Sequence, residues 1–238
     1  MTQNIRYSVD GDGIALLLID VAGRPMNVLT PGFQSDLAEC IQRVATDAAV
    51  RGVVIGSAKS SFMAGADIKD MVGAYDRGIT AAEASRFSYD LSSLLRRLET
   101  CGKPVAAAIN GVALGGGFEV ALACHYRVIA DEPKAGVGLP EVKIGLLPGG
   151  GGTQRVPRLV GVTEALKLIT EGRQLSPADA LKKGLVHEVA PTAEIVERAR
   201  QWILKGGEGV QPWDKKGFRV PGGVGQTSPA AAQTFMAG

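Results

Sequence analysis

The sequence predicts an α/β domain, and two observations lead to this prediction. Short apolar segments of strand length alternate along the chain with longer segments in which apolar residues recur at helical spacing. Hydrophobic residues make up 45% of the 238 residues, which is ordinary for a globular chain with a full core. Because strands and helices alternate, we expect them to form one α/β domain, with room for an appendage.

The strands and helices follow from local patterns. The apolar runs predict buried strands at residues 14–20, 53–57, 105–109 and 127–130. One helix is expected after the cap Thr30-Pro31, with the stripe Phe33, Leu37, Ile41 and Val44. A second carries Phe87, Leu91, Leu94 and Leu98. A third opens at Ser176-Pro177 and closes at Gly184, and a fourth begins at Thr192 and includes Ile195, Ala199 and Ile203.

The character of the chain changes after Lys205. Residues 206–229 are rich in glycine and proline and have no periodicity, which predicts a linker. A capped helix starting at Ser228 then stops after about two turns, so we expect the chain to be the front part of a longer polypeptide. The predicted domains are residues 1–205 and a linker with a truncated helix at 206–238. Aromatic residues in this tail predict partial docking on the domain, through Trp213, Phe218 and Phe235.

Composition excludes several classes of function. A net charge of +2 gives no nucleic-acid or membrane-surface footprint, and the longest apolar stretch, 104–124, contains Glu119. An odd set of cysteines without CxxC spacing, Cys40, Cys101 and Cys124, is typical of a reduced protein. The first residues lack the apolar core of a signal peptide, which favours the cytoplasm. With His125 and His187 as the only histidines, no metal site is expected, and His125 is interpreted as structural.

Glu119 is the first candidate for chemistry. It follows the triple glycine Gly115–Gly117, which leads into a predicted helix at 118–124, so free backbone N–H groups suit an oxyanion there. Burial in the most apolar stretch would raise the pKa of Glu119. A helix-dipole glutamate with no catalytic role is an equal alternative on this segment alone.

Two further segments are candidates only in combination. Residues 62–68, apolar and small, would let a ligand approach the backbone closely, although a simple tight turn would have the same sequence. Glu141 follows Pro140 and precedes the glycine run 149–152; taken alone it is more simply a solvated loop residue. The two glutamates could meet only through tertiary folding.

Familiar glycine motifs do not apply. Val120 stands where the third glycine of a dinucleotide fingerprint belongs, and Thr153-Gln154 replaces the lysine of a phosphate loop. A GxSxG nucleophile elbow is also missing from the sequence.

Taken together, the segments resemble the crotonase (enoyl-CoA hydratase/isomerase) family over residues 10–205. The matching pieces, in order, are residues 24–27 (RPMN), 64–68 (AGADI), 103–107 (KPVAA), 110–111 (NG), the triple-glycine helix with Glu119, Pro140-Glu141, and 149–155 (GGGGTQR). Within the family the closer likeness is to members whose hydratase domain precedes a 3-hydroxyacyl-CoA dehydrogenase part, through residues 123–127, 146–152, 212–214 and 234–236.

The resemblance implies a crotonase-like spiral of repeated ββα units that binds acyl-CoA. Glu119 and Glu141 match the catalytic glutamates, and Ala66 and Gly116 match the oxyanion-hole N–H groups. The predicted substrate- and CoA-binding residues are Ala64, Gly65, Asp67, Ile68, Lys69 and Gly115. Coenzyme A belongs to the substrate, and no cofactor or metal is expected. Implied partners are a further copy of the chain or, for the full-length enzyme, a thiolase subunit.

Two functions compete with the hydratase prediction. A crotonase that uses one glutamate would move a double bond from position 3 to position 2, and this isomerisation is also expected as a second activity. A non-catalytic crotonase-fold module, including RNA-binding forms, is the alternative from another class. The low net charge and the presence of both Glu119 and Glu141 favour the enzyme.

Overall fold

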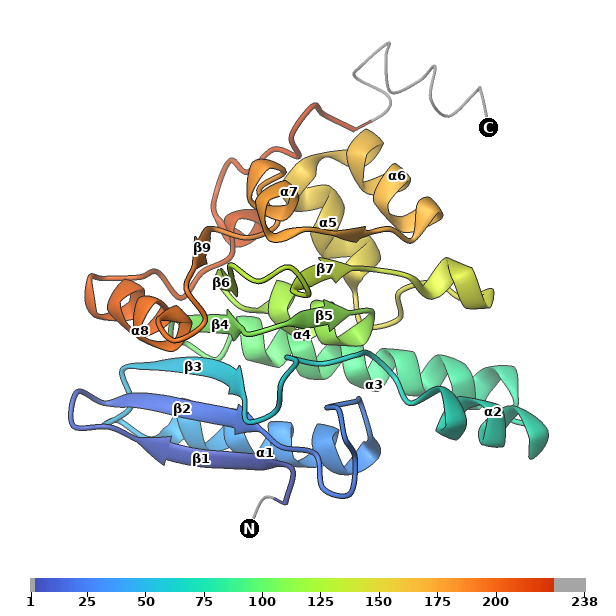
Figure 1. The fold of residues 1–238 in the computed structure, drawn as a ribbon, viewed down its shortest axis with the longest axis horizontal. Helices are drawn as coiled ribbons and strands as arrows, with labels where there is room; N and C mark the ends of the chain where they lie inside the picture. The colour runs from blue at the N-terminus through green and yellow to red at the C-terminus, as the bar shows by residue number, and fades with distance from the viewer. Residues whose placement is uncertain (1–2, 225–238) are drawn as a thin grey trace.

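A computed structural model describes residues 3–224, in which two β-sheets are surrounded by helices (Figure 1). The strands are β1 (Ile5–Val9), β2 (Ile14–Ile19), β3 (Gly52–Ser57), β4 (Val105–Ile109), β5 (Val112–Leu114), β6 (Tyr126–Ala130), β7 (Gly136–Gly138), β8 (Gln174–Leu175) and β9 (Glu188–Ala190). The α-helices are α1 (Pro31–Thr46), α2 (Ile68–Asp76), α3 (Ala81–Glu99), α4 (Gly116–Ala123), α5 (Gly152–Val160), α6 (Val162–Glu171), α7 (Pro177–Lys182) and α8 (Ile195–Leu204). Two short 3₁₀ helices are η1 (Glu141–Ile144) and η2 (Pro212–Asp214).

The larger sheet has the strand order β1-β2-β3-β4-β6-β9. The β1–β2 pair is antiparallel, and the following neighbours are parallel. The smaller sheet has the order β5-β7-β8, with β5 and β7 parallel and β8 antiparallel to β7. Each connection between successive parallel strands of the larger sheet therefore includes at least one helix and returns to that sheet.

The ββα repeat is visible in this path. The chain runs from β4 in the larger sheet to β5 in the smaller sheet and into α4. It then repeats the path as β6, β7 and, after η1, α5. A third turn is β3, a single parallel bridge of Met63 to Ala113 beside β5, and the helices α2 and α3. The predicted α/β class and the crotonase-like spiral are confirmed.

Most local predictions hold. Thr30 caps α1 by accepting a hydrogen bond from the Phe33 N–H (3.1 Å), with Pro31 in the first turn. Of the stripe predicted for α3, Leu91, Leu94 and Leu98 are buried. Phe87 is 42% exposed, so its assignment to the buried stripe is wrong. The N-terminal part of α3 has no sheet beneath it and extends beyond the core beside α2 (Figure 1).

Some boundaries and elements differ from the prediction. The last long helix begins at Ile195, three residues after the predicted start at Thr192. The helices α5 and α6 were not anticipated, because Gly151 and Gly161, both with positive φ, surround a short segment that contains Pro157. The third helix starts after its Ser176 cap as expected.

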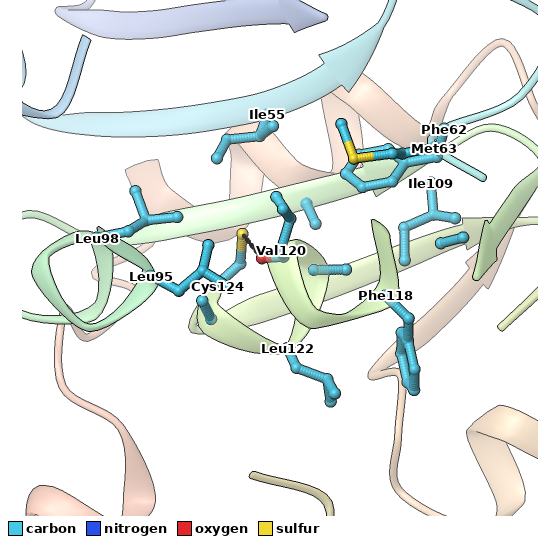
Figure 2. Packing of buried hydrophobic residues seen from close by; sticks show 14 of the residues in the cluster. Ile55, Phe62, Met63, Leu95, Leu98, Ile109, Phe118, Val120, Leu122 and Cys124 are labelled. Atoms are coloured by element: carbon cyan, nitrogen blue, oxygen red, sulfur yellow. Dashed lines mark hydrogen bonds between the residues drawn. The ribbon is translucent and has the colours of Figure 1, made fainter. Parts of the chain in front are cut away.

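The core lies on both faces of the larger sheet. On one face, α8 contributes Ile195, Ala199 and Ile203 to a smaller apolar cluster. The other face is covered by the main cluster, in which α4 is buried along its whole length. Figure 2 shows Val120 of this helix among side chains of α3, β3 and β4, while Leu122 points to the other side of the helix. Any charged group on α4 therefore lies inside the protein.

Residues 206–224 pack against the domain rather than leaving it. Gln211 is fully buried, and its side-chain amide donates to the carbonyls of Ala123 and Cys124 (3.2 Å each). Trp213 and Phe218 are half-buried. Phe235, the third aromatic residue expected to dock, lies outside the described residues, as does the helix expected from Ser228.

Candidate active site

Glu119 lies in the first turn of α4 and is 1% exposed. Its Oε1 accepts a hydrogen bond from the Gly152 N–H at 2.7 Å. Burial raises the pKa of Glu119, while the backbone N–H groups of Gly150–Gly152 and the charge of Arg155 act in the opposite direction. Glu119 is therefore a desolvated carboxyl group suited to proton transfer.

Glu141 is the first residue of η1, directly after Pro140, and is half-buried. Its Oε2 is buried and has no hydrogen-bond partner among residues 3–224. Burial, followed by the negative charge of Glu119, raises the pKa of Glu141 from 4.5 to about 7. The alternative of a solvated loop glutamate does not describe such a group.

Neighbouring glycines bring the two carboxyl groups to one place. A Cβ at Gly115 would lie 3.0 Å from Glu141 Oε1, and one at Gly116 would lie 3.7 Å from Glu119 Oε2. The Gly115 N–H also donates to the Gly138 carbonyl (2.9 Å), which joins the start of α4 to the strand that leads to Glu141. Two interacting carboxyl groups of this kind titrate as a pair and hold one proton between them over a range of pH.

Two backbone N–H groups, those of Ala66 and Gly116, lie beside the glutamates. Gly116 is the first residue of α4, where an N–H has no acceptor within the helix. Within the described part of the chain, neither this N–H nor that of Ala66 donates a hydrogen bond. A Cβ at Gly65 would lie 3.7 Å from the Gly116 nitrogen, so the loop before Ala66 runs alongside the helix start. Such a pair of unpaired donors suits a carbonyl oxygen that gains negative charge.

The helix start requires glycine because other segments approach it closely. A Cβ at Gly116 would lie 2.1 Å from Leu29 Cδ1, and one at Gly117 would lie 2.3 Å from the Met63 carbonyl oxygen. Real Cβ atoms are not found at such distances. The triple glycine therefore lets the segment before Ala66 pack directly on α4.

The residues predicted to bind coenzyme A lie in the loop beside the start of α4 and in the first turn of α2, apart from Gly115, which directly precedes α4. Ala64 and Gly65 belong to the loop beside it, and the Ala64 N–H donates to the Asn27 carbonyl (2.9 Å). Asp67 caps α2, accepting from the Lys69 N–H (2.9 Å), and its side chain pairs with Arg24 at 2.8 Å. Ile68 and Lys69 are exposed in the first turn of α2. The binding role of these residues and of Gly115 stays a prediction.

Asn27 has a supporting role that the sequence did not reveal. Its fully buried side chain donates to the carbonyls of Ile19 (3.0 Å) and Phe62 (3.1 Å) and accepts from the Val21 N–H (2.9 Å). It thereby fixes the ends of β2 and of the segment that leads to Ala66. In the sequence, Asn27 was marked only by its place in the motif at residues 24–27 (RPMN), and this motif did not indicate what the side chain does.

Neither histidine reaches the glutamate pair. His125 accepts at Nδ1 from the Val105 N–H (3.0 Å), and its Nε2 donates to the Glu99 carbonyl (3.1 Å). Burial lowers the pKa of His125. Both ring nitrogens bond to backbone groups, which agrees with the interpretation of His125 as a structural residue. His187 accepts from the Arg127 N–H (3.1 Å), and burial lowers its pKa to about 3.

No helix within residues 3–224 is long and apolar enough to cross a membrane. In the same residues, no group of three or more His, Cys, Asp or Glu side chains is placed to hold a metal ion.

Within residues 3–224, the ββα spiral places the two desolvated carboxyl groups next to two N–H groups that have no acceptor. This arrangement suits acid–base chemistry on a carbonyl compound. Residues 12–208 match the family described as Enoyl-CoA hydratase/isomerase. The chain belongs to this family, and the resemblance drawn from the motifs is confirmed.

Relatives and solved structures agree with this assignment. The chain is 45% identical over 205 residues to the "Fatty acid oxidation complex subunit alpha" of Shewanella sp. strain ANA-3, covering 86% of this chain and 28% of that protein. The corresponding Shewanella halifaxensis protein is 46% identical over 207 residues, 87% of this chain and 29% of its own length. The crystal structure of enoyl-CoA hydratase from Bacillus anthracis is 33% identical with a TM-score of 0.77, covering 85% of this chain and 76% of that one. The chain thus spans under a third of the length of these curated relatives.

The raised pKa of Glu141 predicts a pH-dependent cost to stability. A carboxyl group whose pKa is higher in the folded protein favours folding below its unfolded pKa of about 4.5. This contribution is lost as the pH rises through about 7. Glutamine cannot ionise, so we expect Glu141→Gln to melt at a higher temperature than the wild-type protein at pH 8.5, with a smaller difference at pH 5. Melting curves at both pH values test this, and a Tm difference that is larger at pH 5 would contradict it.

Proposed function

We propose that this protein adds water to trans-2-enoyl-CoA and gives 3-hydroxyacyl-CoA, as a step of fatty-acid β-oxidation. The observation that carries the proposal is the pair of desolvated carboxyl groups, Glu119 and Glu141, beside the unpaired N–H groups of Ala66 and Gly116. The structures similar to this chain include enoyl-CoA hydratases from two bacilli.

The N–H groups would act on the thioester carbonyl. When water attacks the β-carbon of the conjugated system, electrons move from the double bond toward the carbonyl oxygen, which gains negative charge. Donation from Ala66 and Gly116 stabilises that oxygen, and a single donor of this kind can contribute about 3 kcal/mol. Neither N–H has to give up a hydrogen bond to another of the described residues first.

The glutamates would supply base and acid. One carboxylate removes a proton from water as its oxygen bonds to the β-carbon, and the other carboxyl group delivers a proton to the α-carbon. The double bond between these carbons is lost, and the net addition is one water molecule. With one proton held by the pair, base and acid are both present at neutral pH.

The backbone and first helical turn near the site would bind the coenzyme A portion, through Ala64, Gly65, Asp67, Ile68, Lys69 and Gly115. Exposed Lys69 suits the phosphate groups by its charge. Neither a metal nor a redox cofactor is required for this reaction, since coenzyme A enters with the substrate.

Isomerisation of 3-enoyl-CoA to 2-enoyl-CoA is a second activity of the same site. It needs removal of a proton from the α-carbon and its return at the γ-carbon, which one carboxyl group can perform. The non-catalytic alternative is disfavoured because burying carboxyl groups lowers the stability of the fold. Among residues 3–224, the buried Oε2 of Glu141 has no hydrogen-bond partner that would offset this cost.

The setting of the reaction is also a proposal. Cys40, Cys101 and Cys124 are free thiols, which fits the reducing cytoplasm. Because the relatives are subunits of a fatty-acid oxidation complex and are far longer than this chain, we expect the full-length protein to add a dehydrogenase part. A second copy or a thiolase subunit is the expected protein partner.

Incubation with a short 2-enoyl-CoA tests the proposal, by following the loss of absorbance of the conjugated thioester. We expect rapid loss that requires the protein. The same assay started with a 3-enoyl-CoA measures isomerisation as a transient gain of that absorbance. Binding of the thioester without any loss of conjugation would favour the non-catalytic module.

A further inference from the structure

Glu119 depends on the shape of one glycine loop. Besides the bond from the Gly152 N–H, a Cβ at Gly150 would lie 2.7 Å from Glu119 Oε2, so the loop is in contact with both carboxyl oxygens. The loop residues 149–151 form no helix or strand of their own and precede α5. Something else must therefore hold them at this distance.

Arg155 holds the loop from inside. This residue is 5% exposed, and its Nη1 donates to the Gly150 carbonyl at 2.8 Å. A Cβ at Gly151 would lie 2.3 Å from the same nitrogen, so the guanidinium group lies directly beneath the turn. The Nε of Arg155 donates to Glu99 Oε1 at 2.7 Å.

Glu99 connects Arg155 to the protein surface. It is the last residue of α3 and is 2% exposed, and its second oxygen, Oε2, accepts from Arg96 Nη1 at 3.0 Å. Arg96 and Arg155 each bind a different oxygen of this carboxylate, so the two guanidinium groups together fix its orientation. The position of Arg155 therefore depends on Arg96.

Arg96 is held in turn by the segment that follows α8. Its two terminal nitrogens donate to the two oxygens of Asp214, at 2.8 and 2.7 Å. This fork geometry fixes a guanidinium group in one orientation. Asp214 is kept in place because the nearby Gln211 binds the C-terminal carbonyls of α4, the helix that carries Glu119.

We propose that Asp214 and Arg96 are positioning residues for catalysis, acting on Glu119 through Glu99, Arg155 and the loop 149–152. Two acidic and two basic side chains alternate along this path, so their charges balance. The segment after α8, which the sequence predicts as a linker, then becomes part of the active-site scaffold. This inference rests on the proposed role of Glu119 in hydration.

The path also affects the protonation of Glu119. The charged and titratable groups that act on it are Glu141 from η1 and Arg155 from α5, together with the N–H groups of the loop. Arg155 and the N–H groups lower the pKa of Glu119. If the loop loosens, that pKa rises, and the acidic limb of the pH profile moves to higher pH.

The test compares Asp214→Asn and Arg96→Gln with the matched control Asp90→Asn. Asp90 pairs with Arg86 on the same helix α3, at 2.9 Å and in solvent, without any link to the loop. We expect Asp214→Asn to lower kcat about 3- to 10-fold through misplacement of Glu119, with KM within about two-fold. Tm should fall by no more than about 3 °C, because exposed ion pairs contribute little to stability. The acidic limb should shift upward, and the Asp90→Asn control should behave as the wild-type protein.

Two measurements make the test decisive. The double variant Arg96→Gln/Asp214→Asn should lose no more kcat than Arg96→Gln alone, since both changes break one path. Carboxyl NMR titration of Glu119 should show a raised pKa in Asp214→Asn even if no substrate is turned over, so failure of the proposed function remains distinguishable. The inference would be overturned if Asp214→Asn kept the wild-type kcat, pH profile and Glu119 titration. It would also be overturned if Asp214→Asn lost no more kcat than the Asp90→Asn control.

Discussion

Replacing Glu119 or Glu141 by glutamine lowers the hydration rate by about 100-fold or more in our account, the scale of a lost general acid or base. Each glutamate is assigned one proton transfer that an amide cannot perform. The change is nearly isosteric, and the amide oxygen of a glutamine at position 119 can still accept the hydrogen bond from the Gly152 N–H at the start of α5. We therefore expect the fold to persist in both variants, and the loss to appear in kcat rather than in KM.

Initial rates with a 2-enoyl-CoA, together with melting curves, check this result. Isomerisation of a 3-enoyl-CoA serves as the internal comparison, because one carboxyl group suffices for it. We expect one of the two variants to keep much more isomerase than hydratase activity. Near-wild-type hydration by either folded variant would exclude that glutamate from the acid–base pair.

Gly117→Ala is the second change for which a large effect is expected. Its Cβ would lie 2.3 Å from the Met63 carbonyl oxygen and 2.8 Å from the carbonyl carbon, and backbone cannot yield as a flexible side chain does. Overpacking of this kind costs about 1–3 kcal/mol. For a domain of this size that lowers Tm by roughly 2–12 °C.

The same change should reduce catalysis beyond its effect on stability. Met63 lies just before the Ala64–Ala66 loop, so pushing it away from α4 moves the Ala66 N–H from the Gly116 N–H. Loss of one oxyanion donor costs about 100-fold or more in kcat. Gly11→Ala is the control, because a Cβ there meets nothing within 4 Å. A Gly117→Ala protein with wild-type Tm and kcat would contradict the close packing described here.

The sequence predicted most of the elements that have a strong local signal. Thr30-Pro31 and Ser176-Pro177 mark helix starts by capping chemistry, and the runs at 53–57 and 105–109 are too apolar to be anything but buried. The short strand β5 and the pair α5–α6 were not predicted, since β5 has three residues and α5 contains Pro157 between Gly151 and Gly161. Proline and glycine in such short segments are typical of loops, so the local pattern did not indicate regular structure there.

The site was predictable only as a set of motifs. Glu119 has a local signal, since a charge amid an apolar helix must be accounted for. Glu141 has none, because its desolvation arises when η1 folds against Gly115. Their joint assignment came from the family resemblance, and the structure adds that the negative charge of Glu119 helps to raise the pKa of Glu141.

The docking of residues 206–224 could not be read from periodicity. Aromatic residues suggested contact, but the closest contacts are polar, from Gln211 to the end of α4 and from Asp214 to Arg96. Such bonds join residues far apart in sequence and depend on single side chains. A glycine-rich segment of this type therefore has the composition of a linker and the contacts of a structural element.

In the proposed reaction, water is added across the double bond while the thioester stays intact. Turnover of a 2-enoyl-CoA in ¹⁸O-labelled water and, separately, in D₂O, followed by mass spectrometry, tests it most directly. We predict one solvent oxygen on the β-carbon and one solvent deuterium on the α-carbon, with coenzyme A still attached. Release of free coenzyme A with solvent oxygen in a carboxylate would show thioester hydrolysis instead and would contradict the account.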